Sequence, residues 1–316
     1  MSSLRLTRLK FILVFLVILV FSNEWITFMV KTHSWQSLAV KKDDDSLRIL
    51  IVADPQILSV ISEPSFPFNY VAVWDANRFV SRSFHLSLVH TNPDVIIFLG
   101  DLINDGSIST NEEFQNLVKT FKSLFPIFLF CKDCTGTIRY SFEIVFYIPG
   151  DNDIGGERQD RVTSEKVLRF NQAFNVTNRM HHKFLSLIHV NVIPGAEKAI
   201  ATHIPETEKS PSSDLNIIVS HLPLLPGAVE KTMHKIRDAK PNLIISAHDH
   251  DSYKFLGKKS DPKAYQFWVL RDEEKIWDFD LNSEELIEIS APTCSYRMGQ
   301  KKYGFGLRSL IKKRWI

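Results

Sequence analysis

The sequence is poor in the features that mark several common classes of protein. Its 316 residues include three cysteines, and beside Cys131 and Cys134 no second pair exists to complete a four-thiolate zinc site. The formal net charge is only +2, and no long basic stripe carries interleaved aromatic residues, which argues against nucleic acid as a partner. Internal repeats and low-complexity segments are lacking. The remaining composition, 44% hydrophobic and 23% charged, is that of a globular domain with ample material for a core.

A long apolar stretch lies close to the N-terminus. Basic residues within the first ten precede an apolar run from Phe11 to Phe21, and after a short polar interruption the apolar character resumes as far as Val30. This pattern favours an uncleaved signal anchor, with its basic side in the cytosol and the remaining chain in the lumen. We expect a signal anchor over 1–30, a polar linker over 31–46, a folded domain over 47–306 and a basic, solvated tail over 307–316.

Short apolar runs alternate with helical patterns through the rest of the chain. Buried strands are expected over 47–53, 94–100, 143–150, 215–221 and 241–248, helices over 73–90, 110–125, 164–174 and 228–238, and further antiparallel strands within 264–289. Buried strands that alternate with helices predict an α/β fold with helices outside the sheet. The apolar residues of the segment 125–142 follow neither the helical nor the strand period, and we interpret the segment as an insertion loop. Its Cys131 and Cys134 either form a disulfide or remain two plain thiols.

Polar side chains follow each of the five predicted buried strands. They are Asp54 and Gln56 after the first, Asp101 after the second, Asp151, Asn152 and Asp153 after the third, His221 after the fourth, and His248 and His250 after the last. Taken singly, an aspartate here can cap the next helix, and His221 can be a hydrogen-bonded core histidine. Ligands of open α/β sheets collect outside the carboxyl ends of the strands. Five consecutive polar strand ends therefore indicate a dinuclear metal site.

The order of these residues resembles a known family. Asp-x-Gln, Gly-Asp, Gly-Asp-Asn-Asp, His and His-x-His, spread over about residues 47–255, resemble the pattern Asp-x-His, Gly-Asp, Gly-Asn-His-Asp/Glu, His and Gly-His-x-His of the calcineurin-like metallophosphoesterases. The segment EISAPTCSYRMGQKKYGFG (288–306) resembles the C-terminal signature of a membrane-bound branch, that of metallophosphoesterase 1 and the cell division control proteins. The resemblance implies a four-layer α-β-β-α sandwich behind an N-terminal membrane anchor.

The resemblance also implies a ligand set for two divalent ions. One ion would take Asp54, Asp101 and His250, with Gln56 as a weak oxygen ligand, and the other would take Asp101, Asp151, His221 and His248. Asp101 would bridge the ions, and Asp153 and Asp249 would orient the ligands. Imidazole and carboxylate ligands without thiolate favour Mn²⁺, with Fe or Zn²⁺ as alternatives. Two such ions can clamp a phosphoryl group and activate a water molecule for in-line attack.

Three positions depart from the family pattern. Gln56 replaces a metal-binding histidine, and Asp151 replaces an asparagine, which makes the site more negative. Asn152 replaces the histidine that protonates the leaving group, a contribution worth roughly 10²–10⁴-fold in rate. Asn152 and His221 are the catalytic candidates, with His221 stabilising the charge that develops. The missing proton would come from water or from another histidine, such as His181, His182 or His203.

The anchor predicts a luminal domain, and the resemblance implies a phosphodiesterase of the ER and Golgi membrane. The resemblance implies a lipid-linked glycan as substrate, with removal of ethanolamine phosphate from GPI anchors and a role in ER-to-Golgi transport. The sequon at Asn175 agrees with a luminal domain. Two alternatives remain open. One is a phosphomonoesterase of the same family, and the other is a non-catalytic, membrane-anchored trafficking or binding factor, which Asn152 favours.

Overall fold

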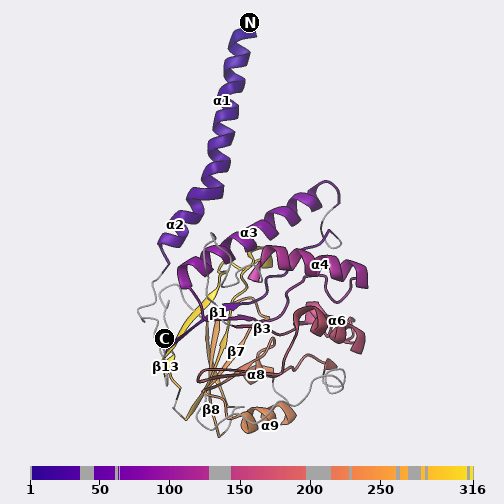
Figure 1. Cartoon of the computed structure of the whole chain (residues 1–316), viewed down its shortest axis with the longest axis vertical. Coiled ribbons are helices and arrows are strands. Elements are labelled where there is room, and N and C mark those ends of the chain that lie inside the picture. Colours follow the sequence, from indigo (N-terminus) through magenta and orange to yellow (C-terminus); the bar gives the residue numbers. More distant parts are fainter. Residues whose placement is uncertain are drawn as a thin grey trace. The chain divides into compact units, whose positions relative to one another are not determined.

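The computed structural model describes residues 2–35, 46–60, 63, 65–127, 144–196, 215–227, 230–260, 264–269, 279–281, 284–311 and 314–315. It divides into two compact units, Met1–Ala39 and Val40–Ile316 (Figure 1). Most of the predicted insertion loop, with Cys131 and Cys134, lies outside the described residues, as does His203.

The N-terminal unit is helical along its described length. It consists of α1 (Ser2–Phe21), the π-helical turn η1 (Ser22–Ile26) and α2 (Thr27–His33). The polar interruption does not end the helix, because the Thr27 hydroxyl donates to the carbonyl of Ser22 at 3.2 Å and the wider turn keeps the backbone paired. Within Thr7–His33, an 18-residue window has a mean hydropathy of 2.2 and no buried residues. By length and composition this helix can cross a membrane.

The second unit contains a six-stranded sheet. Its strands lie in the order β10 (Phe279–Asp280), β13 (Arg314–Trp315), β12 (Gly306–Ile311), β1 (Ser46–Val52), β2 (Val95–Phe98) and β3 (Ile144–Tyr147). β1, β2 and β3 run parallel, as expected for strands joined by helical crossovers. The predicted solvated tail is wrong at this point, because the backbone of Gly306–Ile311 pairs antiparallel with β1. Without β12, β1 would expose a row of unpaired amide and carbonyl groups.

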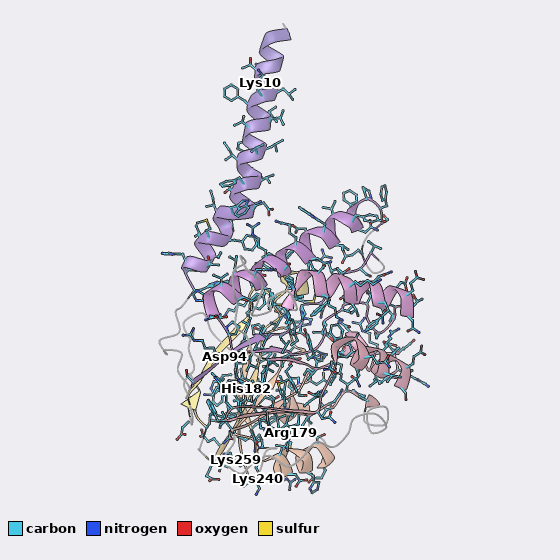
Figure 2. The ribbon with its side chains drawn as sticks, viewed as in Figure 1. Lys10, Asp94, Arg179, His182, Lys240 and Lys259 are labelled. Atoms are coloured by element: carbon cyan, nitrogen blue, oxygen red, sulfur yellow. The ribbon has the colours of Figure 1, made fainter. Side chains whose placement is uncertain are left out.

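A seven-stranded sheet forms the other half. Its order is β4 (Arg179–His182), β5 (Leu185–His189), β6 (Leu215–Val219), β7 (Leu243–Ser246), β11 (Glu285–Ser290), β8 (Tyr253–Lys258) and β9 (Gln266–Val269). The central strands β5, β6, β7 and β11 are parallel, and antiparallel strands close both edges. The hairpin of β4 and β5 was not predicted from the sequence; two labels in Figure 2 mark the ends of β4.

The helices follow the predicted strand–helix alternation. They are α3 (Phe68–Thr91), α4 (Asn111–Leu124), α5 (Asp151–Ile154), α6 (Ser164–Phe174), α8 (Leu224–Gly227) and α9 (Glu230–Ala239), with a 3₁₀ turn η3 (Tyr296–Met298). The predicted start of α4 is confirmed: Thr110 and Glu113 form a reciprocal capping box. The one-turn helix α5 was not predicted, and it begins at a residue of the expected metal site.

Alternate side chains of each central strand face different layers. In β1, Ile49 and Ile51 belong to the core between the two sheets, together with Ile217 of β6. Leu50 of the same strand packs outward with Phe84 of α3. On the far side of the second sheet, a third apolar cluster includes residues of β6, β7 and α9. Helices thus cover the outer faces of two stacked sheets, which confirms the four-layer α-β-β-α sandwich (Figure 1).

Candidate metal centre

The strand-end loops that carry the predicted ligands have unusual backbone conformations. The φ angles are positive at Asp54 (46°), Gln56 (43°), Asp101 (48°), His248 (75°) and His250 (61°). A left-handed conformation costs a residue with a side chain of the order of 1 kcal/mol, and it persists where the surrounding structure fixes it. Five such residues at the ends of β1, β2 and β7 mark a site whose geometry takes precedence over local backbone preference.

Two glycines let these loops approach one another. A Cβ on Gly100, whose φ is +88°, would lie 2.7 Å from His221 Nδ1. A Cβ on Gly150 would lie 2.1 Å from Asp101 Oδ1. Any larger residue would therefore push apart the loops that follow β2, β3 and β6, which explains why a glycine precedes Asp101 and Asp151 in the sequence.

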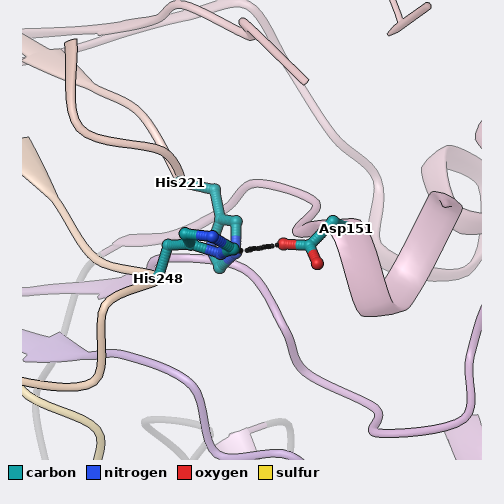
Figure 3. A group of neighbouring side chains, drawn as sticks. All are labelled: Asp151, His221 and His248. Carbon is teal, nitrogen blue, oxygen red and sulfur yellow. Dashed lines mark hydrogen bonds and ion pairs between the residues drawn. The ribbon is translucent and has the colours of Figure 1, made fainter. Parts of the chain in front are cut away.

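The first ligand cluster consists of Asp151, His221 and His248, which come from three different loops (Figure 3). Asp151 Oδ1 lies 2.9 Å from His221 Nε2 and 3.0 Å from His248 Nδ1. The two ring nitrogens are 3.3 Å apart. Three donor atoms thus converge on one point, as required of groups that share a cation.

The tautomer of His221 suits metal binding. Its Nδ1 lies 2.7 Å from the carbonyl oxygen of Leu99 and donates to it, so the lone pair on Nε2 faces Asp151. Burial alone would lower the pKa of this fully buried ring, but the carboxylates, Asp101 foremost, raise it to about 10. A proton or a metal ion is therefore strongly favoured between the ring and the carboxylates.

The second cluster consists of Asp54, Asp101 and His221. Asp54 is completely buried, and among the described residues neither of its carboxylate oxygens has a donor in good hydrogen-bonding geometry. His221 Nδ1 is 3.9 Å away. Burial raises the pKa of Asp54 to about 8, although the two histidine charges oppose the shift. A buried carboxylate without a donor is costly unless a cation compensates it, so these residues fit a divalent ion.

Asp101 lies between the clusters and receives donors from both sides. Its Oδ1 accepts the backbone N–H of Asn152 at 3.0 Å and lies 3.4 Å from His221 Nε2. Its Oδ2 accepts the side-chain amides of Asn152 at 3.0 Å and of Gln56 at 3.2 Å. The Gln56 amide is also 3.1 Å from Nε2 of His250. The two amides that replace family histidines therefore contact the carboxylate expected to bridge.

Asp153 holds two of the loops together. Its buried carboxylate accepts the backbone N–H groups of Gly150 (2.9 Å), Leu102 (3.1 Å) and Ile103 (3.0 Å). These bonds lower the pKa of the carboxyl, but burial outweighs them and raises it to about 8. Asp249, the other residue predicted to orient ligands, is exposed.

The C-terminal segment supplies contacts that sequence reasoning missed. The Thr293 hydroxyl donates to the carbonyl of Asp54 at 2.9 Å, and the Thr293 amide donates to the carbonyl of His250 at 3.3 Å. The Cys294 amide donates to the carbonyl of Ala53 at 2.9 Å. The segment was singled out only for its resemblance to a family signature; its physical role is to brace the loops that hold Asp54 and His250.

Glu288 is a second residue that the sequence did not single out. It is fully buried in β11, and its carboxylate accepts the backbone amides of Leu224 and Leu225, each at 2.7 Å. Burial raises its pKa to about 7. The contact fixes the chain directly after His221. A single glutamate inside the otherwise apolar stretch LIEI (286–289) was the available signal.

Of the predicted site residues, the structure gathers Asp54, Asp101, Asp151, His221 and His248 into the two clusters. Gln56 and Asn152 contact Asp101, and His250 contacts Gln56. Together they offer carboxylate and imidazole donors suited to two divalent metal ions. The histidines of β4, His181 and His182, belong to neither cluster.

Comparison with known proteins agrees with this geometry. Residues 47–252 match the family model for calcineurin-like phosphoesterases. The chain is 27% identical over 221 residues to metallophosphoesterase 1 of zebrafish, covering 68% of this chain and 52% of that protein. It is 23% identical over 286 residues to cell division control protein 1 of Saccharomyces cerevisiae, covering 84% of this chain and 56% of that protein.

The chain thus spans about half the length of the curated relatives it matches. Among solved structures, a dimetal phosphatase from zebrafish covers 84% of this chain and 92% of its own, with 12% identity and a TM-score of 0.45. The family match extends from β1 to the residues directly after His250, and so includes every ligand of both clusters. The chain belongs to the calcineurin-like phosphoesterase family.

Proposed function

We propose that this chain is a membrane-anchored phosphodiesterase that removes ethanolamine phosphate from a GPI or related lipid-linked glycan. The observation that carries the proposal is the convergence of Asp54, Asp101, Asp151, His221 and His248 at the strand ends. The two relatives named above support the branch of the family, and the apolar N-terminal helix supports the anchor. The GPI part of the proposal rests on the resemblance to the branch of these relatives.

Each half of the centre would hold one divalent ion, with Asp101 between them. When bound, the ions supply Lewis-acid activation of water and of the phosphoryl oxygens. His221 keeps its Nδ1 proton on the Leu99 carbonyl and presents Nε2, so its orientation is fixed before substrate arrives. The buried walls around Asp54 and Asp101 exclude bulk water, which strengthens electrostatic interactions at the reacting phosphate.

The charge of the site favours a diester over a monoester. Asp151 adds a third carboxylate to those of Asp54 and Asp101, where the family pattern has a neutral asparagine. Two divalent ions then leave only a small net positive charge. A phosphodiester carries one negative charge and a monoester about two at neutral pH, so the weaker field matches the diester better.

Asn152 determines how the leaving group departs. Its amide donates to Asp101 Oδ2 at 3.0 Å and has no proton to transfer. With Asn152 unable to supply it, the proton of the leaving oxygen would come from solvent, and turnover should then lack the fall at high pH that a histidine general acid gives to a pH–rate profile. Asn152 is also the observation that favours a non-catalytic membrane factor as the second candidate.

The test is a substrate panel on the full chain, reconstituted in vesicles and loaded with Mn²⁺. We expect release of ethanolamine phosphate from a GPI glycan, slower turnover of phosphomonoesters, and loss of both in Asp101→Asn. Metal binding without turnover of any ester would support the non-catalytic factor. Turnover confined to monoesters would support a phosphomonoesterase.

The luminal orientation has its own test. Asn175 is exposed at the C-terminal end of α6, where an oligosaccharide can be added without disturbing the core. We expect the chain made in cells to lose mass on treatment with an N-glycosidase, and Asn175→Gln to lack that shift. An unmodified chain in ER membranes would contradict the proposed topology.

A further inference from the structure

An aromatic patch lies where α3 begins. It consists of Phe66, Phe68, Tyr70, Val71 and Trp74, whose exposed fractions are 77%, 70%, 60%, 61% and 62%. One end of α3 projects past α4 (Figure 1). Within the sequence FPFNYVAVW (66–74) there is no charged residue. Contiguous exposed apolar side chains of this size mark an interaction surface.

The patch is distinct from the part of α3 that packs on the domain. The buried residues of the helix begin at Ala76 and continue through Val80, Phe84 and Leu88. The first two turns contribute none of them. Large aromatic side chains are therefore placed on a helix end that the six-stranded sheet does not cover, and the stability of the domain does not account for them.

The patch is tied to the metal centre by short connections. Asn77, in the next turn of α3, accepts from the Leu58 amide at 3.1 Å and donates to its carbonyl at 3.3 Å. Leu58 follows Gln56 by two residues. Tyr296 in turn donates to Asp75, and its segment braces Asp54 through Thr293. The start of α3 and the metal-binding loop are thus held as one rigid piece.

Basic groups border the patch. The guanidinium of Arg78 lies 4.8 Å from the Trp74 ring centre and pairs with Asp75 at 2.9 Å. Arg297 pairs with Glu63, just before the patch, at 2.6 Å. Aromatic side chains beside arginine are typical of protein that sits in the headgroup layer of a bilayer, where the rings meet the acyl chains and the guanidinium meets phosphate.

We propose that the aromatic patch inserts into the headgroup layer of the bilayer that holds the N-terminal helix, and so presents the metal centre to phosphodiesters at that surface. The short linker between the two units favours the bilayer over a soluble partner. Residues 36–45 connect the two units, and when fully extended they reach roughly 35 Å. The tether keeps the domain at high effective concentration near the bilayer. The inference rests on the anchoring proposed above and not on the identity of the substrate.

The test uses the full chain reconstituted in phosphatidylcholine vesicles. The fluorescence of Trp74 is obtained by subtracting the fluorescence of the Trp74→Phe variant from that of the wild-type protein. This substitution keeps the position apolar. We expect lipids brominated on the acyl chains to quench most of this emission, and iodide in the water to quench little of it. Trp268→Phe provides the control, because Trp268 is 43% exposed on β9 at the edge of the other sheet. Its emission should respond to iodide and not to brominated lipid.

A functional readout separates this inference from the proposed activity. The double variant Phe68→Ser/Tyr70→Ser should lose turnover of a diester embedded in vesicles and retain turnover of a water-soluble diester. If iodide quenches Trp74 as strongly as Trp268 in a chain that resists carbonate extraction, the proposed insertion of the aromatic patch is wrong. The proposed membrane anchor would still stand. Shielding of Trp74 from both quenchers in a chain that has become dimeric would also overturn the insertion, in favour of a second copy. Loss of the chain from vesicles in carbonate would overturn the anchoring on which it rests.

Discussion

The two halves of the metal centre are built from different chemistry. Around Asp151, two imidazoles lie within 3.0 Å of one carboxylate oxygen, so the ligand atoms already stand close together. The other half offers the buried carboxylate of Asp54, which has no donor among the described residues, and Asp101, while the predicted ligand His250 is met through the Gln56 amide. A preorganised site binds more tightly than one that must rearrange an amide. We therefore expect two ions of unequal affinity.

The largest effect should come from Asp101, the carboxylate predicted to serve both halves. Asp101→Asn removes the carboxylate that faces both clusters, and we expect turnover to fall by about 10³-fold, the scale of losing a major electrostatic stabiliser. Metal analysis of the purified variant should show that both ions are weakened together. Asp249→Asn is the control, because Asp249 is exposed and next to the ligands. Loss of only one ion in Asp101→Asn would show that the halves do not share this group.

Single-histidine variants should separate the halves. His248→Ala removes a ligand atom 3.0 Å from Asp151 and should abolish the tighter binding event. His250→Ala should leave that event in place and abolish the weaker one. Calorimetric titration of Mn²⁺ into the metal-free chain resolves the two steps. If both variants lose the same step, the comparison between the halves is wrong.

Gln56→His should reduce the difference in affinity between the two metal ions. An imidazole is a better ligand than a neutral amide, and the family pattern has histidine at this position. We expect the weaker ion to bind about tenfold more tightly, which corresponds to about 1.4 kcal/mol. The tighter ion should be unaffected, since the Gln56 amide contacts Asp101 and His250 but neither Asp151 nor His248. Gln56→Leu, which has no ligand atom, should weaken the same ion.

The strand-end residues could be predicted because they follow a simple rule of α/β folds. Asp54, Asp101 and His221 each come directly after an apolar run that could be recognised as a buried strand. The parallel strands β1 and β2 of one sheet and β6 of the other bring those ends together, so order in sequence was enough to predict convergence in space. The four layers, in contrast, came from family resemblance, because periodicity cannot assign strands to one sheet or to two.

What could not be predicted depends on contacts distant in sequence. The basic side chains of 307–316 suggested solvent, yet the backbone there pairs with β1, more than 250 residues away. Glu288 is charged in sequence and completely buried in structure, because two amides of the loop after His221 satisfy it. No local sequence pattern indicates hydrogen-bond partners that are so distant along the chain. The exposed aromatic start of α3 was likewise missed, because the predicted helix began at residue 73 whereas α3 begins at Phe68. Periodicity does not show which turns the domain leaves uncovered.

The pH dependence of metal stabilisation is a weaker but broader test of the same centre. In the metal-free protein, burial raises the pKa of Asp54 to about 8 and of Asp101 to about 6, from a reference of 3.8. The folded state therefore holds protons that the unfolded state has released, and its stability falls as pH rises from about 4 toward 8. The carboxylates raise the pKa of His221 to about 10 from 6.5, and the stability this adds is also lost as pH rises toward 10.

A divalent ion replaces the protons that these groups hold, so it should stabilise most where the protons have left. We expect saturating Mn²⁺ to raise the melting temperature of the full chain by several degrees more at pH 8 than at pH 5, on a scale of about 2–4 °C for each kcal/mol. Differential scanning fluorimetry measures both shifts. In Asp54→Asn the metal-free chain should lose part of its pH dependence, since the substituted amide does not titrate. If Mn²⁺ raised the melting temperature equally at both pH values, protons and metal would not compete for these carboxylates. The unequal affinities of the two halves would then need another cause.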